Sequence, residues 1–357
     1  MKLSLCALFA ALAATNAFAP SLPHFARSQV SFAQTKKTTT TLNALGGLAK
    51  KAKKEALRKY AQDGIDDAVM EKYNLMKEKM ADIDLSNQTP GPLQQALTRR
   101  KGTITVIAEY KRKIQSGFVS DIYDPEILSP TFREYGVSGI AVMADEKMGG
   151  CSYDDIATFV EEQRRAQYQV PGSVPLINND LIIDELQIAR TAAVGAIACV
   201  ITLSIVGDED LPGLLKASKA IDIEPIVAVS SHEEAQRAID LGARLISVIH
   251  VDGIDGKLGV VNGLVIPEGQ QVCKIANILA KNDKQLQEIE EAWAVRDKGF
   301  NCAWVGEALY KSGSDATEHP GAIIKSMKSK SSLKWASPKA SSGRGEGARE
   351  YLGDILM

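Results

Sequence analysis

Residues 225–249 read PIVAVSSHEEAQRAIDLGARLISVI, and this stretch contains the unit from which the fold is built. Its first five residues, Pro225 to Val229, are apolar and include three β-branched side chains, which is typical of a buried strand. Residues 232–241 place apolar side chains at helical spacing, and Leu245 to Ile249 form a second apolar run. A strand, a helix and a second strand joined by short turns predict two parallel strands with a right-handed crossover.

The same unit recurs on both sides of this stretch. Predicted strands cover residues 104–108, 139–143, 174–177, 196–202, 225–229, 245–249, 275–279 and 303–305, and predicted helices cover 125–135, 153–167, 185–194, 211–221, 232–241 and 284–298. Eight such units are typical of a (β/α)8 TIM barrel, so we assign an α/β barrel to residues 99–328. The segment Asp252 to Gln271 is glycine-rich and lacks helical periodicity, so we expect helix six to be short or missing.

Segments of different composition flank the barrel. Residues 45–98 are rich in Lys, Ala and Glu and place apolar side chains at helical spacing, which predicts an N-terminal helical extension of one or two helices, followed by a short helix over 92–97. The basic cluster Lys50 to Lys54 is either a contact for an anionic surface or a solvated helix face. Residues 329–357 are rich in Ser, Lys and Gly, so we expect a flexible C-terminal tail.

Residues 1–44 have the composition of a targeting leader. Met1-Lys2, an apolar stretch and small residues as far as Ala17 are typical of a signal peptide over 1–17. Residues 18–44 contain many Ser and Thr, three basic residues and no acid, which is typical of a transit segment. The junction Ala17-Phe18-Ala19-Pro20 resembles the two-part presequence of algae with secondary plastids. The resemblance implies a location in the plastid (chloroplast) stroma, and plain secretion is the alternative.

The charge of the chain is unevenly distributed. Its 42 Lys+Arg and 44 Asp+Glu give a net charge of -2, but eight of the basic residues precede the first acid, Glu55. The remaining chain therefore has 34 basic against 44 acidic residues, which argues against a nucleic acid as partner. After the leader, no apolar run reaches the roughly 18 residues of a membrane span. The cysteines are widely spaced, without a C-x-x-C pair or clustered histidines, so we expect neither a metal nor a cofactor.

Catalytic residues of such a barrel follow the carboxyl ends of the strands. These positions read Ala108-Glu109-Tyr110-Lys111-Arg112 after strand one, Asn179-Asp180-Leu181-Ile182-Ile183-Asp184 after strand three and Val305-Gly306-Glu307-Ala308-Leu309 after strand eight. Their ordered series resembles the indole-3-glycerol phosphate synthase family, from about Pro92 to Tyr310. The resemblance implies a tryptophan-pathway lyase that closes an indole ring with loss of carbon dioxide and water. Such chemistry needs a general acid, a general base and a cation near the substrate carboxylate.

The resemblance also implies which positions are catalytic. Glu109 and Lys111 match the strand-one pair of the family, and their alternate spacing puts both side chains on one face. The other positions are substituted: the strand-three Lys is Asn179, the strand-five Glu is Ala228, the strand-six Asn is Ile249 and the strand-seven Glu is Ala280. An asparagine cannot donate a proton as an acid. We therefore expect most synthase activity to be lost.

The family's phosphate-binding positions fall on Ser116, Lys281, Gly306 and Glu307. Gly306 precedes a predicted helix whose backbone amides suit a phosphate, and Lys281 adds a cation. Two functions stay open. The chain is either a synthase in which a relocated cation such as Lys281 or Lys147 acts, or a non-catalytic pseudoenzyme that binds a phosphorylated ligand or a protein partner. His250 is the only histidine at the predicted barrel mouth. It is either a group that titrates near neutral pH or a structural residue.

Overall fold

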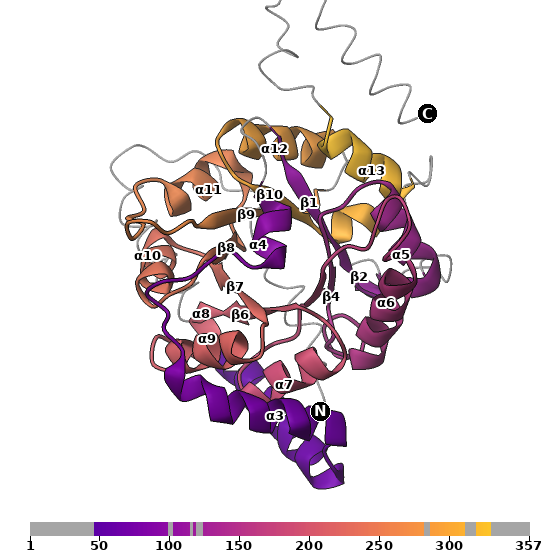
Figure 1. Cartoon of the computed structure of the whole chain (residues 1–357). Coiled ribbons are helices and arrows are strands. Elements are labelled where there is room, and N and C mark those ends of the chain that lie inside the picture. Colours follow the sequence, from indigo (N-terminus) through magenta and orange to yellow (C-terminus); the bar gives the residue numbers. More distant parts are fainter. Residues whose placement is uncertain are drawn as a thin grey trace, which may run out of the picture.

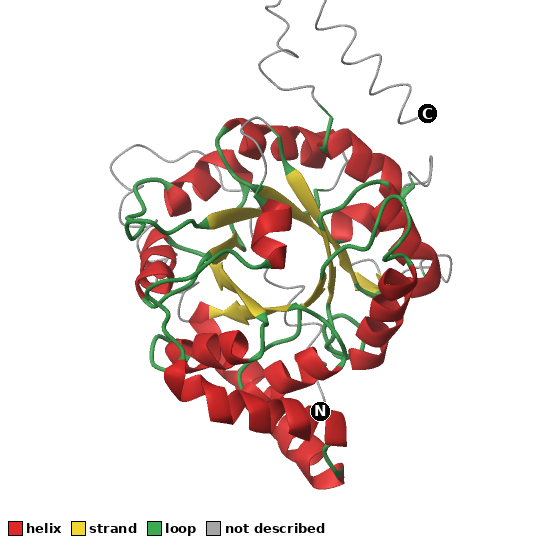
Figure 2. Cartoon of the chain, viewed as in Figure 1, coloured by secondary structure: helices red, strands yellow, loops and turns green. Residues whose placement is uncertain are grey.

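Eight parallel strands close into a barrel in the computed structural model, which describes residues 46–98, 103–114, 117–118, 124–281, 286–310 and 319–329 (Figures 1 and 2). The strands are β1 (Thr105–Tyr110), β4 (Gly139–Val142), β5 (Leu176–Asn178), β6 (Ala198–Thr202), β7 (Glu224–Val229), β8 (Leu245–Val248), β9 (Cys273–Ile278) and β10 (Cys302–Val305). Each pairs with its sequence neighbour in this set, and β1 closes the barrel by pairing with β10. The predicted (β/α)8 TIM barrel is confirmed. A short hairpin of β2 (Lys113–Ile114) and β3 (Gly117–Phe118) follows β1.

Helices surround the barrel on its outside (Figure 1). They are α5 (Pro125–Glu134), α6 (Tyr153–Arg165), α7 (Glu185–Ala193), α8 (Leu203–Val206), α9 (Leu211–Ala220), α10 (His232–Asp240), α11 (Gly253–Val261), α12 (Leu286–Asp297) and α13 (Pro320–Met327). Side chains cap several N-termini; Ser152 and Asp155 form a capping box on α6, and Ser231 accepts the backbone N–H of Glu234 in α10. These caps fix where the capped helices begin, and thereby the length of the loops that precede them.

Helix six corrects the expectation drawn from its glycines. The alternative in which it is missing is wrong: α11 has nine residues, as many as α7 and α10. Tertiary contacts outweigh the poor helix propensity of glycine, because Val260 and Val261 are buried and the ammonium of fully buried Lys257 pairs with Glu291 of α12. The predicted absence of helical structure holds only for the loop after Val261.

The core has two parts, one inside the barrel and one between the barrel and its helices. Alternate residues along each strand point to one part or the other. The inner part consists of Leu93, Leu97, Ile107, Ala141, Ile177, Ala198, Val200, Ile226, Ala228, Leu245, Cys273, Ile275, Cys302 and Trp304. Because these side chains fill the barrel, it is a packed core and its chemistry is confined to its two ends.

The N-terminal end of the barrel, here called the floor, is closed by α4 (Pro92–Leu97), which lies at the centre of the ring in Figure 1. Leu93 and Leu97 are fully buried within the inner core. The carboxylate of Glu224, at the start of β7, accepts hydrogen bonds from the backbone N–H groups of Leu93 and Gln94. The Gln94 side chain donates to the carbonyl of Gln271 at 2.9 Å. The floor is thus sealed by apolar packing and by polar groups that satisfy one another.

The N-terminal extension consists of a helix over residues 46–63, then α3 (Asp67–Lys79) and the short η1 (Met80–Asp82). The predicted N-terminal helical extension is confirmed, and Gly64 separates its two α-helices with a positive φ of 110°. Helix α3 packs against α7 and α9 on the outside of the barrel (Figure 1). Among the described residues, no helix is both long and apolar enough to cross a membrane. The predicted leader segments 1–17 and 18–44, and the tail after residue 329, lie outside the described residues.

Candidate functional site

Glu109 is the central side chain at the C-terminal end of the barrel, here called the mouth. It lies near the end of β1, and its side chain is only 6% exposed. One carboxylate oxygen, Oε2, accepts a hydrogen bond from the indole Nε1 of Trp304 at 2.6 Å. The hydroxyl of Tyr310 donates to the Glu109 backbone carbonyl at 2.8 Å. Both groups hold Glu109 in place, so its carboxylate is an integral part of the packed interior.

Lys111 extends this group toward the rim. Its ammonium lies 3.5 Å from Glu109 Oε1 and 3.7 Å from Glu307 Oε2, and its side chain is 15% exposed. The predicted pairing of Glu109 with Lys111 on one face is therefore present in the structure. Among the described residues, two carboxylates thus flank this ammonium.

Asn179 lies directly against this group. It follows β5, and its side-chain amide Nδ2 donates to Glu109 Oε2 at 3.3 Å. Its backbone N–H donates to the carbonyl of Val142 at 2.8 Å, which extends the pairing of β4 and β5 by one residue. Asn179, predicted to stand at the family's lysine position, therefore lies at the mouth, where its neutral amide donates to Glu109.

The other three positions predicted to be substituted carry apolar side chains, so they contribute no polar group to the mouth. Ala228 is buried in the inner core, and Ile249 packs against the same core. Ala280 follows β9 and is exposed. The barrel has filled the space below the mouth with apolar atoms, including the large indole of Trp304, which is 3% exposed.

Three of the four predicted phosphate-binding residues, Lys281, Gly306 and Glu307, are among the described residues. Ser116 lies outside them. The ammonium of Lys281 pairs with Asp252 and, at 3.5 Å, with Glu291. Burial lowers the pKa of Lys281, but Asp252 and Glu291 raise it by more, so the net shift is upward and the lysine stays protonated. Its charge is already compensated by carboxylates.

Gly306 and Glu307 also differ from the prediction. The predicted helix after Gly306 is a single 3-10 turn, η3 (Glu307–Tyr310), so it offers no extended helix terminus to an anion. A Cβ atom at Gly306 would lie 3.1 Å from the Glu109 carboxylate, which makes a side chain at this position unfavourable. Glu307 itself adds a negative charge beside Lys111. Gly306 therefore serves the packing around Glu109.

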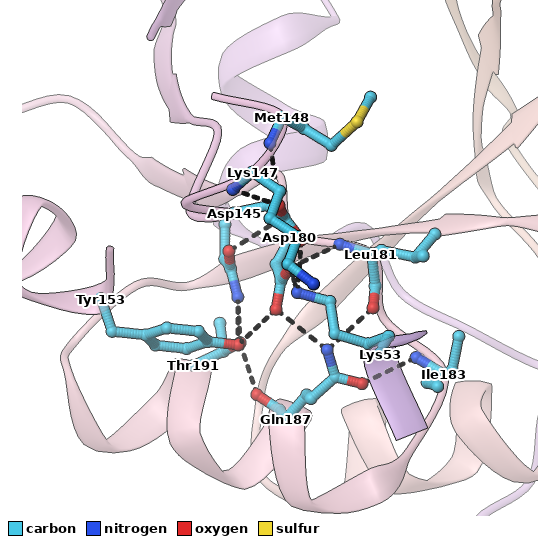
Figure 3. A network of polar contacts seen from close by, with 11 residues as sticks. Lys53, Asp145, Lys147, Met148, Tyr153, Asp180, Leu181, Ile183, Gln187 and Thr191 are labelled. Carbon is cyan, nitrogen blue, oxygen red and sulfur yellow. Dashed lines mark hydrogen bonds and ion pairs between the residues drawn. The ribbon is translucent and has the colours of Figure 1, made fainter. Parts of the chain in front are cut away.

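A second polar cluster at the rim was not foreseen from the sequence (Figure 3). Lys53, from the helix over residues 46–63, places its ammonium between Asp145 after β4, at 2.7 Å, and Asp180 after β5. Burial lowers the pKa of Lys53, but the two carboxylates raise it by more. Burial alone would raise the pKa of Asp145, but Lys53 and the backbone N–H groups of Met148 and Lys147 bring it below its usual value. The cluster thus places one ammonium between two carboxylates.

The remaining candidates do not form a reactive group. His250 follows β8 with a positive φ of 57° and is exposed. Burial raises the pKa of Cys151, Cys199 and Cys302 to about 12, so these thiols stay protonated at neutral pH. Within the described ranges, no group of three or more His, Cys, Asp or Glu side chains has a geometry that would hold a metal ion.

Comparison with known proteins identifies the relatives of this barrel. A family model described as indole-3-glycerol phosphate synthase matches residues 56–318. The indole-3-glycerol phosphate synthase of Carboxydothermus hydrogenoformans is 28% identical over 236 residues, which cover 65% of this chain and 85% of that protein. The indole-3-glycerol phosphate synthase of Petrotoga mobilis is 26% identical over 214 residues, which cover 59% of this chain and 81% of that protein. A solved thiamine phosphate pyrophosphorylase from Pyrococcus furiosus superposes with a TM-score of 0.42 at 14% identity, covering 71% of this chain and 97% of that chain.

Proposed function

Because the chain belongs to the indole-3-glycerol phosphate synthase family, we propose that it is a barrel of tryptophan-biosynthesis ancestry that no longer works as a synthase. A pseudoenzyme of this kind keeps the fold and loses the site. The observation that carries the proposal concerns Asn179, which we place where the family has the lysine that acts as general acid. Its side-chain Nδ2 donates to Glu109 Oε2 at 3.3 Å. A side-chain amide can neither donate a proton as an acid nor supply a positive charge to a substrate carboxylate.

The losses at the other positions add to this argument. Ala228 replaces a family carboxylate with a buried methyl group, and exposed Ala280 replaces another. A well-placed acid or base contributes roughly 10²–10⁴-fold to a rate, so losing several groups from one site removes most of the acceleration even where their effects are not additive. Two features weigh against the proposed replacement cations: Lys281 is already paired with two carboxylates, and Lys147 is an exposed residue of the rim.

The charges at the mouth support a neutral or cationic occupant over a phosphorylated one. Glu109 and Glu307 both face Lys111, so one ammonium has two carboxylates to neutralise it before any ligand arrives. An anion would have to displace a carboxylate from Lys111 or approach two like charges. Of the two ligand classes open to a pseudoenzyme, a protein partner is therefore favoured over a phosphorylated small molecule. The composition of residues 1–44 supports a plastid location, which a fluorescent fusion of that segment would test.

The decisive experiment is incubation of the protein without its leader with the family substrate, a carboxyphenylamino deoxyribulose phosphate, while the fluorescence of the indole product is followed. We expect no turnover under conditions in which an active synthase converts the substrate. The matched variant carries Asn179→Lys together with Ala228→Glu, because these two changes return the family's acid and one carboxylate. Turnover by the unmodified protein would overturn the proposal, and activity that depends on the two changes would support it.

A further inference from the structure

The Lys53 cluster connects the N-terminal extension to the mouth, and we propose that Lys53 is a positioning residue that fixes Asn179, and through it Glu109 and Trp304, by neutralising Asp180. Figure 3 shows the Lys53 side chain reaching the group formed by Asp145 and Asp180. The role is independent of synthase turnover, because it concerns the geometry of the mouth and holds for any ligand.

The first step is the position of Asp180 in the chain. It directly follows Asn179, and the two side chains point in different directions: Asn179 toward Glu109 in the mouth, Asp180 toward α6 and α7. The side chain of Asp180 is 3% exposed. Its backbone N–H donates to Asn178 Oδ1 at 3.0 Å, and its own Oδ1 accepts the N–H of Leu181 at 2.7 Å. A displacement of Asp180 must therefore move the neighbouring residue in the mouth.

The second step is the charge balance around Asp180. Besides Lys53, its side chain accepts from the hydroxyl of Tyr153 at 3.2 Å and the amide of Gln187 at 2.9 Å, both neutral donors. Among the described residues, Lys53 is the only cation that forms an ion pair with this carboxylate. A buried carboxylate that loses its cation is strongly destabilised, so it must take up a proton or move toward water. Either response changes the position that Asn179 adopts.

The third step is a second attachment of the same helix. The guanidinium of Arg190 in α7 lies 4.4 Å from the ring centre of Tyr60 and 3.9 Å from that of Tyr153. Cation–π contacts of this kind hold aromatic rings to a guanidinium group. Tyr153 in turn donates to Asp180, and Asp180 pairs with Lys53. The contacts form a closed circuit from the extension through α7, α6 and β5 back to the extension.

The same helix offers a matched control. Lys50 also forms an ion pair with the barrel, at 3.0 Å from Asp210, and donates to the carbonyl of Val206 at 3.1 Å. Its partner Asp210 is 57% exposed and lies after β6, away from Asn179 in the sequence. Replacing Lys50 therefore removes an attachment of the helix without removing the charge that neutralises Asp180.

The test uses the indole N–H of Trp304 as a reporter, because this group and the Asn179 amide both donate hydrogen bonds to the Glu109 carboxylate. The indole ¹H–¹⁵N resonances of the protein without its leader are recorded for the unmodified chain and for Lys53→Met, Lys53→Arg and Lys50→Met, with the Trp304 signal assigned by Trp304→Phe. Trp293, whose indole donates to the Ser326 carbonyl at 3.0 Å in the helical shell, is the internal reference for intact folding.

We expect Lys53→Met to shift the Trp304 signal while that of Trp293 stays in place, and we expect Lys53→Arg and Lys50→Met to leave both unchanged. Adding Asp180→Asn to Lys53→Met removes the uncompensated charge and should return the Trp304 signal toward its original position. An unchanged Trp304 signal in Lys53→Met overturns the proposal, and so does an equal shift in Lys50→Met. If Lys53→Met alone does not fold, the double variant decides: a folded double variant with the original Trp304 signal supports the proposal, and any other result contradicts it.

Discussion

The floor and the mouth of this barrel are built from the same eight strands, yet they use polar side chains in different ways. At the floor, Glu224 and Gln94 bind backbone groups of α4 and of the neighbouring loop, and apolar Leu93 and Leu97 fill the centre. At the mouth, Glu109 binds other side chains that belong to three different strands or loops. Backbone partners are independent of sequence, whereas side-chain partners change with every substitution. The floor can therefore stay constant while the mouth diverges.

The largest effect is expected when the packing of α4 at the floor is disrupted. Leu97→Ala removes a fully buried side chain from the inner core and leaves a cavity, so we expect the free energy of unfolding to fall by about 2–5 kcal/mol. Denaturant unfolding followed by circular dichroism measures the loss. The control is Leu48→Ala, whose side chain is 53% exposed and whose replacement should change stability by no more than about 0.5 kcal/mol. Equal effects of the two variants would show that α4 does not seal the floor.

A smaller effect tests whether the mouth is now structural. Glu109→Leu leaves the buried N–H of Trp304 without its acceptor, which should cost roughly 1–3 kcal/mol of stability. Glu109→Gln keeps an acceptor oxygen and should cost less. A residue kept for catalysis commonly lowers stability, and its replacement raises the free energy of unfolding. A gain in stability for Glu109→Leu in denaturant unfolding would therefore contradict the structural role.

The smallest effect is that side chains at the mouth and at the floor contribute to stability with opposite dependence on pH. Asp145 at the rim has a lowered folded pKa, so its contribution is present above the unfolded value of 3.8 and is lost as the pH falls. Glu224 at the floor has a raised pKa, because burial outweighs its two backbone donors, so its ionisation costs stability as the pH rises through and above 4.5. As the pH falls, the difference in free energy of unfolding between the unmodified protein and Asp145→Asn should become smaller. The corresponding difference for Glu224→Gln should become larger. Urea unfolding across this pH range measures both differences. If they change in the same direction with pH, the opposite pKa shifts of Asp145 and Glu224 are contradicted.

The sequence predicted the barrel because its strands are buried on both faces, which leaves recurring apolar, β-branched runs such as Pro225 to Val229. It left open whether helix six would be short or missing, because part of what holds α11 in place is the ion pair between Lys257 and Glu291, 34 residues apart. It gave no indication of α13, which packs against α12 and α5. Local patterns thus identify elements that are held by their own apolar face, and they fail where a distant side chain provides the stability.

The same limit applies to the mouth. Glu109 and Lys111 could be paired from their spacing, since they lie two residues apart on one strand. The contact of Glu109 with Trp304 joins residues 195 positions apart, and the contact of Lys53 with Asp180 joins residues 127 apart. The only trace of the latter was the basic run from Lys50 to Lys54, in which Lys50 and Lys53 lie three residues apart and so share a helix face. Nothing in that run indicated which carboxylates they would meet.

The chain that precedes β1 reaches both ends of the barrel, since the helix over residues 46–63 contacts the rim and α4 closes the floor. Shortened forms of the protein will therefore fall into two kinds. A chain that starts after residue 63 keeps α4 and loses the attachments that Lys50, Lys53 and Tyr60 make to the rest of the barrel. A chain that starts after residue 97 is opened at both ends at once, and its failure to fold would say nothing about the mouth. Any minimal version of this barrel has its boundary between those two residues.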